Sequence, residues 1–270
     1  MQSKLALSGL GVAALLLFGL PSRAEDLEQL TGTATFDVQF MSSDKPEVTG
    51  MAGRRQFTFT RLCDQSVEHD NAQLTVFLSD GGQWTIEIDM TEAEDAKSLT
   101  FAYSSKLNGK EVDVASGVAA RVDTGIAVHI TAPVEQALNL PSDVRLSVEA
   151  TQDIIRAAMK GERTVELKVF NGPALYGERV FTLRAEIGDA RTDDQTEAEK
   201  LFARKVGRND LLRWPVKWTL TAAESGRVLD VSDTLLCANG IQIGMVDYAN
   251  GYRNRYELVD FQSEPVVPCL

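Results

Sequence analysis

The sequence predicts a mostly-β protein of about a dozen antiparallel strands, arranged as a large barrel or a sandwich. Apolar and polar residues alternate in many segments, and a period of two places one set of side chains in a core and the other in solvent. Such strands are typical of antiparallel sheets with one solvated face. The clearest alternating segments are 36–40, 57–60, 74–78, 84–90, 99–103, 126–130, 165–169, 181–187 and 216–220. Turn-forming pairs separate them, namely Gly81-Gly82, Asn108-Gly109, Asn171-Gly172, Ser225-Gly226 and Asn239-Gly240.

The first 24 residues have the pattern of a secretory signal peptide. Lys4 supplies a positive start, residues 5–20 carry no charge, and Ser22 and Ala24 offer small side chains before an expected cleavage after Ala24. An uncleaved membrane anchor is the alternative, but the apolar run of about 16 residues is short of the roughly 20 that span a bilayer. We therefore expect export to the periplasm and a mature chain, residues 25–270, without a transmembrane segment.

The mature chain is acidic. The whole chain has 27 basic and 39 acidic residues, and loss of residues 1–24 removes Lys4 and Arg23, so 25 − 39 gives a formal charge of −14. Phosphate backbones and anionic head groups repel such a protein, which argues against nucleic acid as a partner. No linker rich in Pro, Gly or Ser divides residues 25–270, so we expect a single β domain after the signal peptide.

Two segments depart from the alternating pattern and predict helices. Residues 151–160 have an apolar face at helical spacing, with Thr151 as the expected cap and Gly161 as the expected end. Residues 193–206 are highly charged with a narrow apolar stripe, which fits either a helix or an exposed loop.

Three cysteines permit three disulfide pairings, and an oxidising compartment favours one bridge. Cys269 lies in a tail that a bridge would hold in place, whereas Cys237 follows an apolar run that suits a buried free thiol. The pair favoured on these grounds is Cys63 and Cys269, which would close a loop of about 200 residues and contribute roughly 5 kcal/mol at most. Zinc is the alternative, but the scattered cysteines and two histidines lack the spacing of a metal site. We expect no metal.

Little in the sequence points to catalysis. His69 and His129 are the two imidazoles; His129 falls on the polar side of an alternating segment, and His69 lies between two acids. A histidine beside an acid is too common to define a Ser-His-Asp site. Nucleotide-binding loops and the nucleophile-elbow pattern are absent from the sequence. We expect a protein that is not an enzyme, with no catalytic residues and no cofactor.

Six aromatic residues have two interpretations. They belong either to an ordinary core, which is the usual fate of large apolar side chains, or to the lining of a ligand cavity inside a curved sheet. These residues are Phe36, Phe40, Trp84, Tyr103, Trp214 and Trp218.

The C-terminal third contains a specific combination of short motifs, namely Asn239-Gly240-Ile241, then Asp247-Tyr248 and a terminal Pro268-Cys269. In these motifs the chain resembles the EipB family of periplasmic cell-envelope integrity proteins. Less specific similarities are Trp214-Pro215-Val216, the helical stretch from Thr151 to Glu162, and Gly53 followed by an aromatic strand and Cys63. The chain differs from the family pattern at Thr31, Gly32, Asp153 and Cys237.

The resemblance implies a large open or spiral antiparallel β-barrel, which we expect to have about 12–14 strands and one or two helices. It also implies a disulfide between the positions of Cys63 and Cys269 and a role in envelope integrity. The expected function is that of a periplasmic scaffold or binding protein with an envelope protein as its partner. The alternative is a carrier that holds a lipid or an acyl chain in the concave face of the barrel.

The favoured pairing predicts that peptide mapping under non-reducing conditions will recover Cys63 and Cys269 in one cross-linked fragment. Cys237 is expected to react with an alkylating reagent only after denaturation, since a buried thiol is shielded. A cross-linked fragment that contains Cys237 would contradict the pairing.

Overall fold

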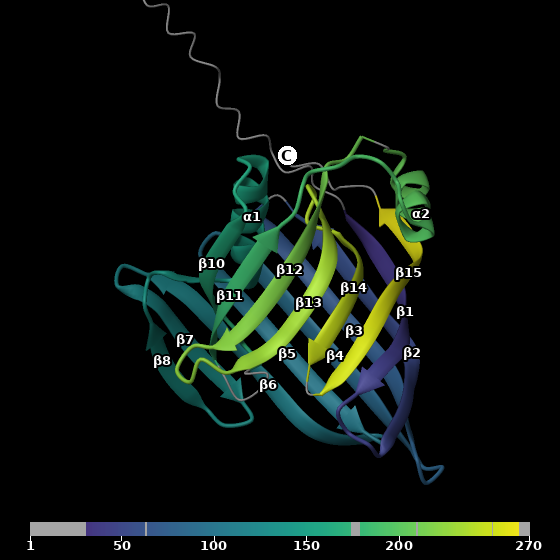
Figure 1. Ribbon diagram of the computed structural model, residues 1–270. Helices are drawn as coiled ribbons and strands as arrows, with labels where there is room; N and C mark the ends of the chain where they lie inside the picture. Colours follow the sequence, from purple (N-terminus) through teal and green to yellow (C-terminus); the bar gives the residue numbers. More distant parts are fainter. Residues whose placement is uncertain (1–30, 63, 174–178, 209, 250, 265–270) are drawn as a thin grey trace, which may run out of the picture.

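The computed structural model describes residues 31–62, 64–173, 179–208, 210–249 and 251–264, and they form one continuous sheet that curls into a nearly closed barrel (Figure 1). The chain builds this sheet in two arms. The first arm contains β1 (Thr31–Ser43), β2 (Val48–Arg61), β3 (Gln65–Leu78), β4 (Gln83–Asp95), β5 (Ser98–Leu107), β6 (Lys110–Val122), β7 (Gly125–Ala132) and β8 (Gln136–Leu140). The second contains β9 (Val144–Arg145), α1 (Ser147–Met159), β10 (Thr164–Phe170), β11 (Val180–Ile187), α2 (Glu197–Val206), β12 (Arg213–Ala222), β13 (Val228–Cys237), β14 (Gln242–Ala249) and β15 (Tyr252–Glu264).

The two arms join where the first described strand meets the last. β1 pairs with β15 in antiparallel register, from Thr31 opposite Glu264 to Ser43 opposite Tyr252. The sheet order runs from β8 through β1 and β15 to β9, so the two edges are β8 and β9, which are consecutive in the chain. β9 pairs with β10 in parallel, whereas the other neighbouring strands are antiparallel. An open seam therefore lies between the two edges.

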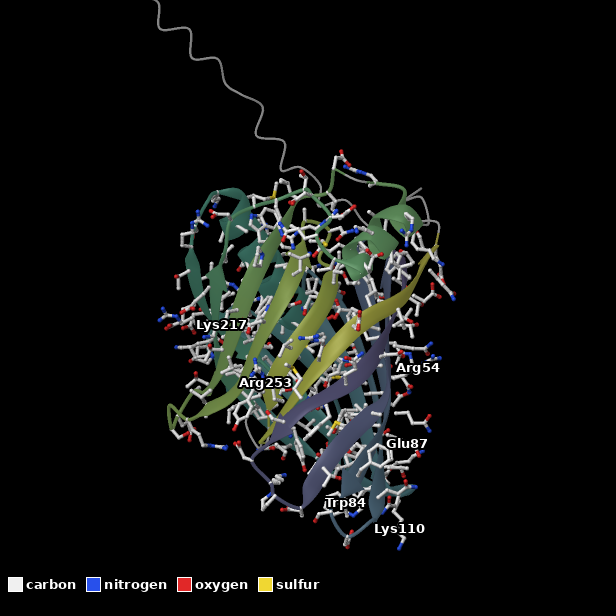
Figure 2. All side chains as sticks on the ribbon, turned by 45° about the vertical axis from the view of Figure 1, so that its right-hand side comes forward. Arg54, Trp84, Glu87, Lys110, Lys217 and Arg253 are labelled. Carbon is white, nitrogen blue, oxygen red and sulfur yellow. The ribbon has the colours of Figure 1, made fainter. Side chains whose placement is uncertain are left out.

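The alternation of the sequence becomes an inner and an outer face. Phe36 on β1 lies opposite Arg55 on β2 and Leu258 on β15, and all three side chains face the interior. The neighbouring positions face outward, and Figure 2 shows Arg54, Glu87, Lys217 and Arg253 projecting from the outside of the barrel.

Helix α1 packs against the inner face of the second arm. Ile154 and Ile155 are 0% and 1% exposed. They form a core cluster with side chains of β11, β12 and β13, including Leu183, Trp214 and Leu236. One face of the helix therefore fills part of the interior.

Helix α2 lies against the C-terminal end of β15 (Figure 1). Phe202 packs edge-on against Phe261, with ring centroids 4.9 Å apart. Thr196 caps the helix by accepting the N–H of Glu199, and Gly207 ends it in the left-handed conformation. The helix thus covers one end of the core cluster that contains Phe36 and Phe59.

The predicted fold class is confirmed, with two differences in detail. The sheet has 15 strands against the expected 12–14, because the edges include the short strands β8 and β9. The expectation that α1 begins at Thr151 is wrong: the helix begins at Ser147, and the Thr151 hydroxyl donates back to the carbonyl of Ser147. Its end is as predicted, with Gly161 at a φ of 79°. Charged residues 193–206 contain the shorter helix α2.

In the part of the chain that the structure describes, no helix combines the length and the apolar character needed to cross a membrane.

Candidate functional site

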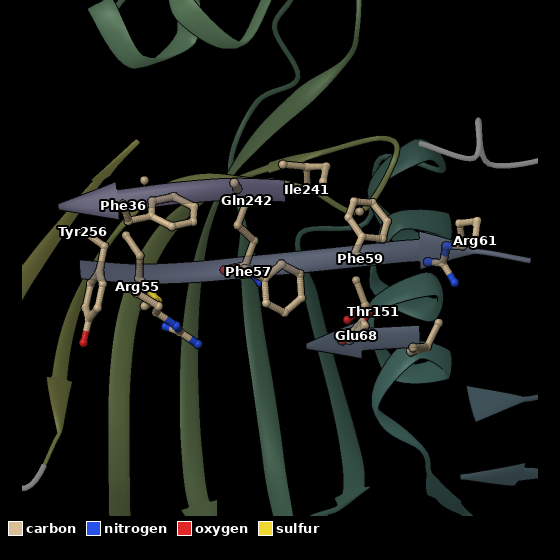
Figure 3. A pocket seen from close by; sticks show the side chains of 15 residues that line it. Phe36, Arg55, Phe57, Phe59, Arg61, Glu68, Thr151, Ile241, Gln242 and Tyr256 are labelled. Carbon is tan, nitrogen blue, oxygen red and sulfur yellow. The ribbon is translucent and has the colours of Figure 1, made fainter. Parts of the chain in front are cut away.

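A cavity of about 130 Å³ lies inside the barrel, between the β1–β2 wall, α1 and the start of β14 (Figure 3). Apolar side chains and a few charged ones share its lining. The lining residues are Ala34, Phe36, Arg55, Phe57, Phe59, Arg61, Glu68, Val148, Thr151, Gly240, Ile241, Gln242, Gly244, Met245 and Tyr256.

One wall of this cavity is aromatic. Phe57 and Phe59 are two residues apart on β2 and therefore share its inner face, with ring centroids 6.3 Å apart. Phe36 comes from the adjacent strand and is 8% exposed. An engineered apolar cavity of about 150 Å³ holds benzene, so this cavity matches a six-carbon group rather than a whole lipid.

Arg55 lies beside the aromatic wall and forms an ion pair with Asp70. Its Nε and Nη2 donate to the two carboxylate oxygens of Asp70 at 2.8 and 2.6 Å. Burial alone would lower the pKa of Arg55, but the Asp70 carboxylate outweighs burial and raises it. Asp70 therefore occupies the Nε–Nη2 side of the Arg55 guanidinium.

Arg61 and Glu68 line the same cavity without such partners. The Arg61 guanidinium lies 5.7 Å from the centre of the Phe59 ring and forms no ion pair or side-chain hydrogen bond with the described residues. Burial lowers the pKa of Arg61, and Glu68 and Glu94 partly offset this effect. Burial raises the pKa of Glu68 to about 7, with further contributions from Glu92 and other acids.

A row of acids continues from Glu68 across β4. Glu68 lies opposite Glu92, and Ser66 lies opposite Glu94. Glu92 and Glu94 are 8% and 5% exposed. Burial raises the pKa of both, and that of Glu94 rises to about 7.

Glu94 caps the N-terminus of α1 from a distant strand. Its two oxygens accept the backbone N–H groups of Val148 at 2.8 Å and Glu149 at 2.9 Å. The N-cap residue is Leu146, whose side chain has no acceptor, so a carboxylate from β4 satisfies the amide groups that a helix start leaves free.

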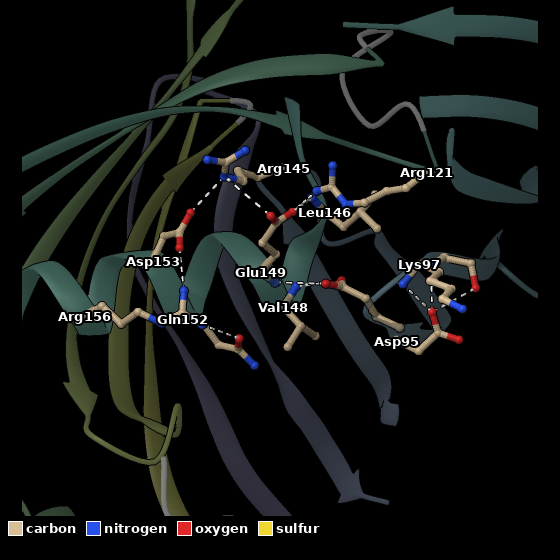
Figure 4. A network of polar contacts seen from close by, with 12 residues as sticks. Asp95, Lys97, Arg121, Arg145, Leu146, Val148, Glu149, Gln152, Asp153 and Arg156 are labelled. Atoms are coloured by element: carbon tan, nitrogen blue, oxygen red, sulfur yellow. Dashed lines mark hydrogen bonds and ion pairs between the residues drawn. The ribbon is translucent and has the colours of Figure 1, made fainter. Parts of the chain in front are cut away.

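Ion pairs fix the exposed side of α1. Arg121 of β6 pairs with Glu149, and Arg145 of β9 lies 2.8 Å from Asp153 and 3.6 Å from Glu149 (Figure 4). Arg156 pairs with Asp153 at 2.6 Å within the helix. These contacts and the Glu94 cap determine where Val148 and Thr151 enter the cavity.

A second polar group lies on the inner face of β13–β15. Burial raises the pKa of Asp230 to about 7, with the Asp247 charge adding to the effect. Asp247 accepts the Tyr256 hydroxyl at 3.2 Å, and burial raises its pKa as well. Asn254 lies opposite Asp247 and is 5% exposed. The interior therefore carries acids on two walls.

The predicted site residues fall in different places. Cys63 and Cys269 lie outside the described residues, so their bridge stays a prediction. Cys237 is 0% exposed at the end of β13, and burial raises the pKa of its thiol to about 12, as suits a buried free cysteine. The two histidines face outward: His69 pairs with Asp89 and His129 with Glu135, each at 3.1 Å.

The six aromatic residues lie on inward positions of their strands, but they differ in burial and in what they contact. Trp214 is core at 2% exposure, Phe36 lines the cavity, and Trp84 is 36% exposed near the opposite end of the barrel from α2 (Figure 2). Phe40, Tyr103 and Trp218 are partly buried. The core interpretation is therefore confirmed for Trp214, whereas Phe36 lines a cavity whose ligand binding stays a prediction.

Sequence reasoning missed Arg61, Glu68 and Glu94. All three occupy inward positions of their strands, where charges interrupt the apolar series. That interruption was the available signal. Within the described ranges, no group of three or more His, Cys, Asp or Glu side chains is arranged to hold a metal ion.

Comparisons with known proteins agree with the architecture. A family model described as EipB-like matches residues 24–225, well over half of the chain. No curated protein matches the chain significantly. A solved structure of a β-barrel-like protein, a DUF1849 domain of unknown function from Brucella abortus, is similar with a TM-score of 0.79. The match covers 88% of this chain and 99% of that chain at 20% sequence identity, so it bears on the fold alone.

The Glu94 cap predicts that Glu94→Ala lowers the free energy of unfolding by about 1–3 kcal/mol, because two buried N–H groups lose their acceptor. Urea denaturation at about pH 6 measures the change. Glu87→Ala is the matched control, since Glu87 is on the outer face of the same strand, 41% exposed and 3.7 Å from Lys106; it is expected to change stability by less than about 0.5 kcal/mol. Equal effects of the two substitutions would contradict the cap.

The buried acids predict that stability falls as pH rises. Glu68, Glu94 and Asp230 have a pKa of about 7 in the folded protein, above the ordinary 4.5, 4.5 and 3.8. Between those values the folded chain binds more protons than the unfolded chain, so the free energy of unfolding decreases from about pH 4.5 to about pH 7 and levels off above.

Urea denaturation at a series of pH values tests this dependence. Glu68→Gln is expected to reduce the slope, whereas Glu87→Gln on the outer face is expected to leave it unchanged. Stability that is flat or increasing over this range would show that the interior acids are ionised at low cost.

Proposed function

The chain belongs to the EipB-like family, and from that premise we propose that it is a periplasmic binding protein that supports cell-envelope integrity without catalysing a reaction. The signal-like residues 1–24, which lie outside the described residues, support export. The acidic composition supports a partner other than nucleic acid.

The main support for the proposal is the difference between the polar groups on the inner face of the barrel and those on its outer face. The interior contains a cavity with an aromatic wall, acids, and the Arg61 guanidinium, which has no ion-pair partner in the part of the chain that the structure describes; such groups can hold a ligand. The two imidazoles, the usual general bases, lie on the outer face, 44% and 57% exposed, each beside a single carboxylate. Binding is therefore better supported than acid–base catalysis.

A carrier of a lipid or an acyl chain is the second candidate, and one observation favours it. Several apolar side chains on the inner face remain partly exposed, among them Ile86, Ile88 and Leu220, while Leu107 is 38% exposed. Helix α1 counts against it, because Ile154 and Ile155 fill the space next to β11–β13. Any acyl chain is limited to the remaining part of the interior.

Complementation of a deletion strain tests the proposal. Loss of the gene is expected to sensitise the cells to a detergent such as deoxycholate, and the double variant His69→Ala/His129→Ala is expected to restore survival fully. A catalytic imidazole contributes about 10²–10⁴-fold to a rate, so failure of a double variant that accumulates normally would contradict the non-catalytic role. A deletion strain with an unaffected envelope would contradict the envelope role.

Native mass spectrometry of the protein purified from the periplasm without detergent separates the two candidates. A bare chain agrees with the scaffold, and its partner is then sought by cross-linking in intact cells. A reproducible added mass of lipid size would place the carrier first.

A further inference from the structure

The cavity contains a cation, Arg61, that forms no ion pair with any residue the structure describes. Arg61 is half-buried near the C-terminal end of β2, and among the described residues its guanidinium has no carboxylate within ion-pair distance. Arg55 lies three inward positions earlier on the same face of β2, with Phe57 and Phe59 between the two arginines, and it is paired with Asp70. A partly desolvated guanidinium without an ion-pair partner can bind an anion. Two of its N–H groups lie parallel and can donate to both oxygens of a carboxylate, which favours this anion.

A proton donor lies next to this cation. Glu68 on β3 is opposite Phe59 and one inward position from Ser66, which is opposite Arg61. No hydrogen bond ties the Glu68 carboxyl to the described residues. In its neutral form this carboxyl donates one hydrogen bond, so Arg61 and Glu68 both supply donors to the lining of the cavity.

The rest of the cavity suits an apolar group. Phe36, Phe57 and Phe59 form one wall, Val148 of α1 and Ile241 before β14 contribute aliphatic surface, and the volume of about 130 Å³ matches about six carbon atoms. One unpaired guanidinium balances one negative charge. A phosphate dianion would meet a single free cation and the nearby acids Glu92 and Glu94, so a monoanion fits better.

We propose that this cavity binds a small apolar monocarboxylate, with its carboxylate on Arg61 and Glu68 and its carbon chain or ring on Phe36, Phe57 and Phe59. The inference rests on the proposed function, because it names the ligand class for the interior site of a binding protein. It adds a specific chemistry that neither the family nor the fold assigns.

The site has a defined pH dependence. The charged groups that influence Glu68 are Arg61 from β2, Asp70 from its own strand and Glu92 and Glu94 from β4, while α1 presents only the hydroxyl of Thr151 at the cavity. Burial raises the pKa of Glu68 to about 7. Below that pH the neutral carboxyl donates to the ligand, and above it the carboxylate repels the ligand and neutralises Arg61. Affinity therefore falls as pH rises through about 7.

Titration of the full mature chain with hexanoate, followed by ligand-observed NMR, tests the inference. Hexanoate is expected to bind more tightly than 1-hexanol, hexylamine or inorganic phosphate. Arg61→Gln is expected to weaken hexanoate by about 10-fold or more, since a charge-assisted hydrogen bond is lost, and to leave 1-hexanol unchanged. Glu68→Gln is expected to remove the loss of affinity between about pH 6 and about pH 8.

Arg54→Gln is the matched control. Arg54 is on the same strand but on the outer face, with a side chain 72% exposed and an ion pair to Asp37 at 3.2 Å (Figure 2). It is expected to leave hexanoate binding unchanged. Arg61→Lys keeps the cation and is expected to keep part of the affinity, which provides a second variant if Arg61→Gln fails to fold by circular dichroism.

The same chemistry occurs in free fatty acids and at the C-terminal residue of a protein. Acetyl-alanyl-leucine with a free carboxylate, compared with its amide, distinguishes the second source from hexanoate. Tighter binding of hexanoate than of 1-hexanol supports the inference, and tighter binding of the peptide acid than of its amide in addition identifies a protein C-terminus as a source of the carboxylate.

Equal binding of hexanoate and 1-hexanol, or equal losses for Arg61→Gln and Arg54→Gln, would overturn it. A chain that restores the envelope of the deletion strain yet binds no carboxylate disproves this inference alone, whereas failure of the wild-type chain in that assay disproves the proposed function.

Discussion

The pairing of β1 with β15 is the interaction on which the barrel depends. It joins two arms that each meander outward from the middle of the sheet, and it links residues more than 200 positions apart in the chain, such as Thr31 and Glu264. Phe36 lies between Arg55 and Leu258 only because this ladder is in place. The cavity, whose lining comes from β1, β2, α1, the start of β14 and β15, therefore exists only after both arms have met. Such non-local pairing is entropically costly to form and is typical of slow-folding β proteins.

Enclosure by the sheet also explains how the interior groups acquire their properties. A carboxyl such as Glu94 is costly to bury as an anion, yet the N-terminus of α1 favours the anion. Burial prevails, and the pKa rises to about 7. Asp70 shows the opposite solution, in which a bidentate arginine keeps the charge. The interior of the first arm thus contains the Arg55–Asp70 ion pair and two acids, Glu68 and Glu94, with a pKa of about 7. It also contains Arg61, which has no ion-pair partner among the described residues.

The sequence predicted the strands well because alternation is a local signal. The segments 84–90 and 216–220 reveal both their strands and their inward residues. It failed where the decisive partner is distant. The start of α1 depends on Glu94, more than 50 residues upstream, and a Leu at the N-cap gives no local indication of it. Arg61 and Glu68 become a site through the register of β2 with β3 and the position of α1, neither of which has a sequence motif. The short edge strands β8 and β9 escaped notice because two to five residues carry too little periodicity.

The seam between β8 and β9 gives the barrel a mechanical freedom that a closed barrel lacks. In a closed barrel the strand number and the stagger of the hydrogen bonds fix the diameter. Here the ring is split, and residues 141–143 connect its two ends as a short link. Because the two edges are joined by three residues of chain and not by paired strands, no ladder between the described edge strands sets the width of the bore.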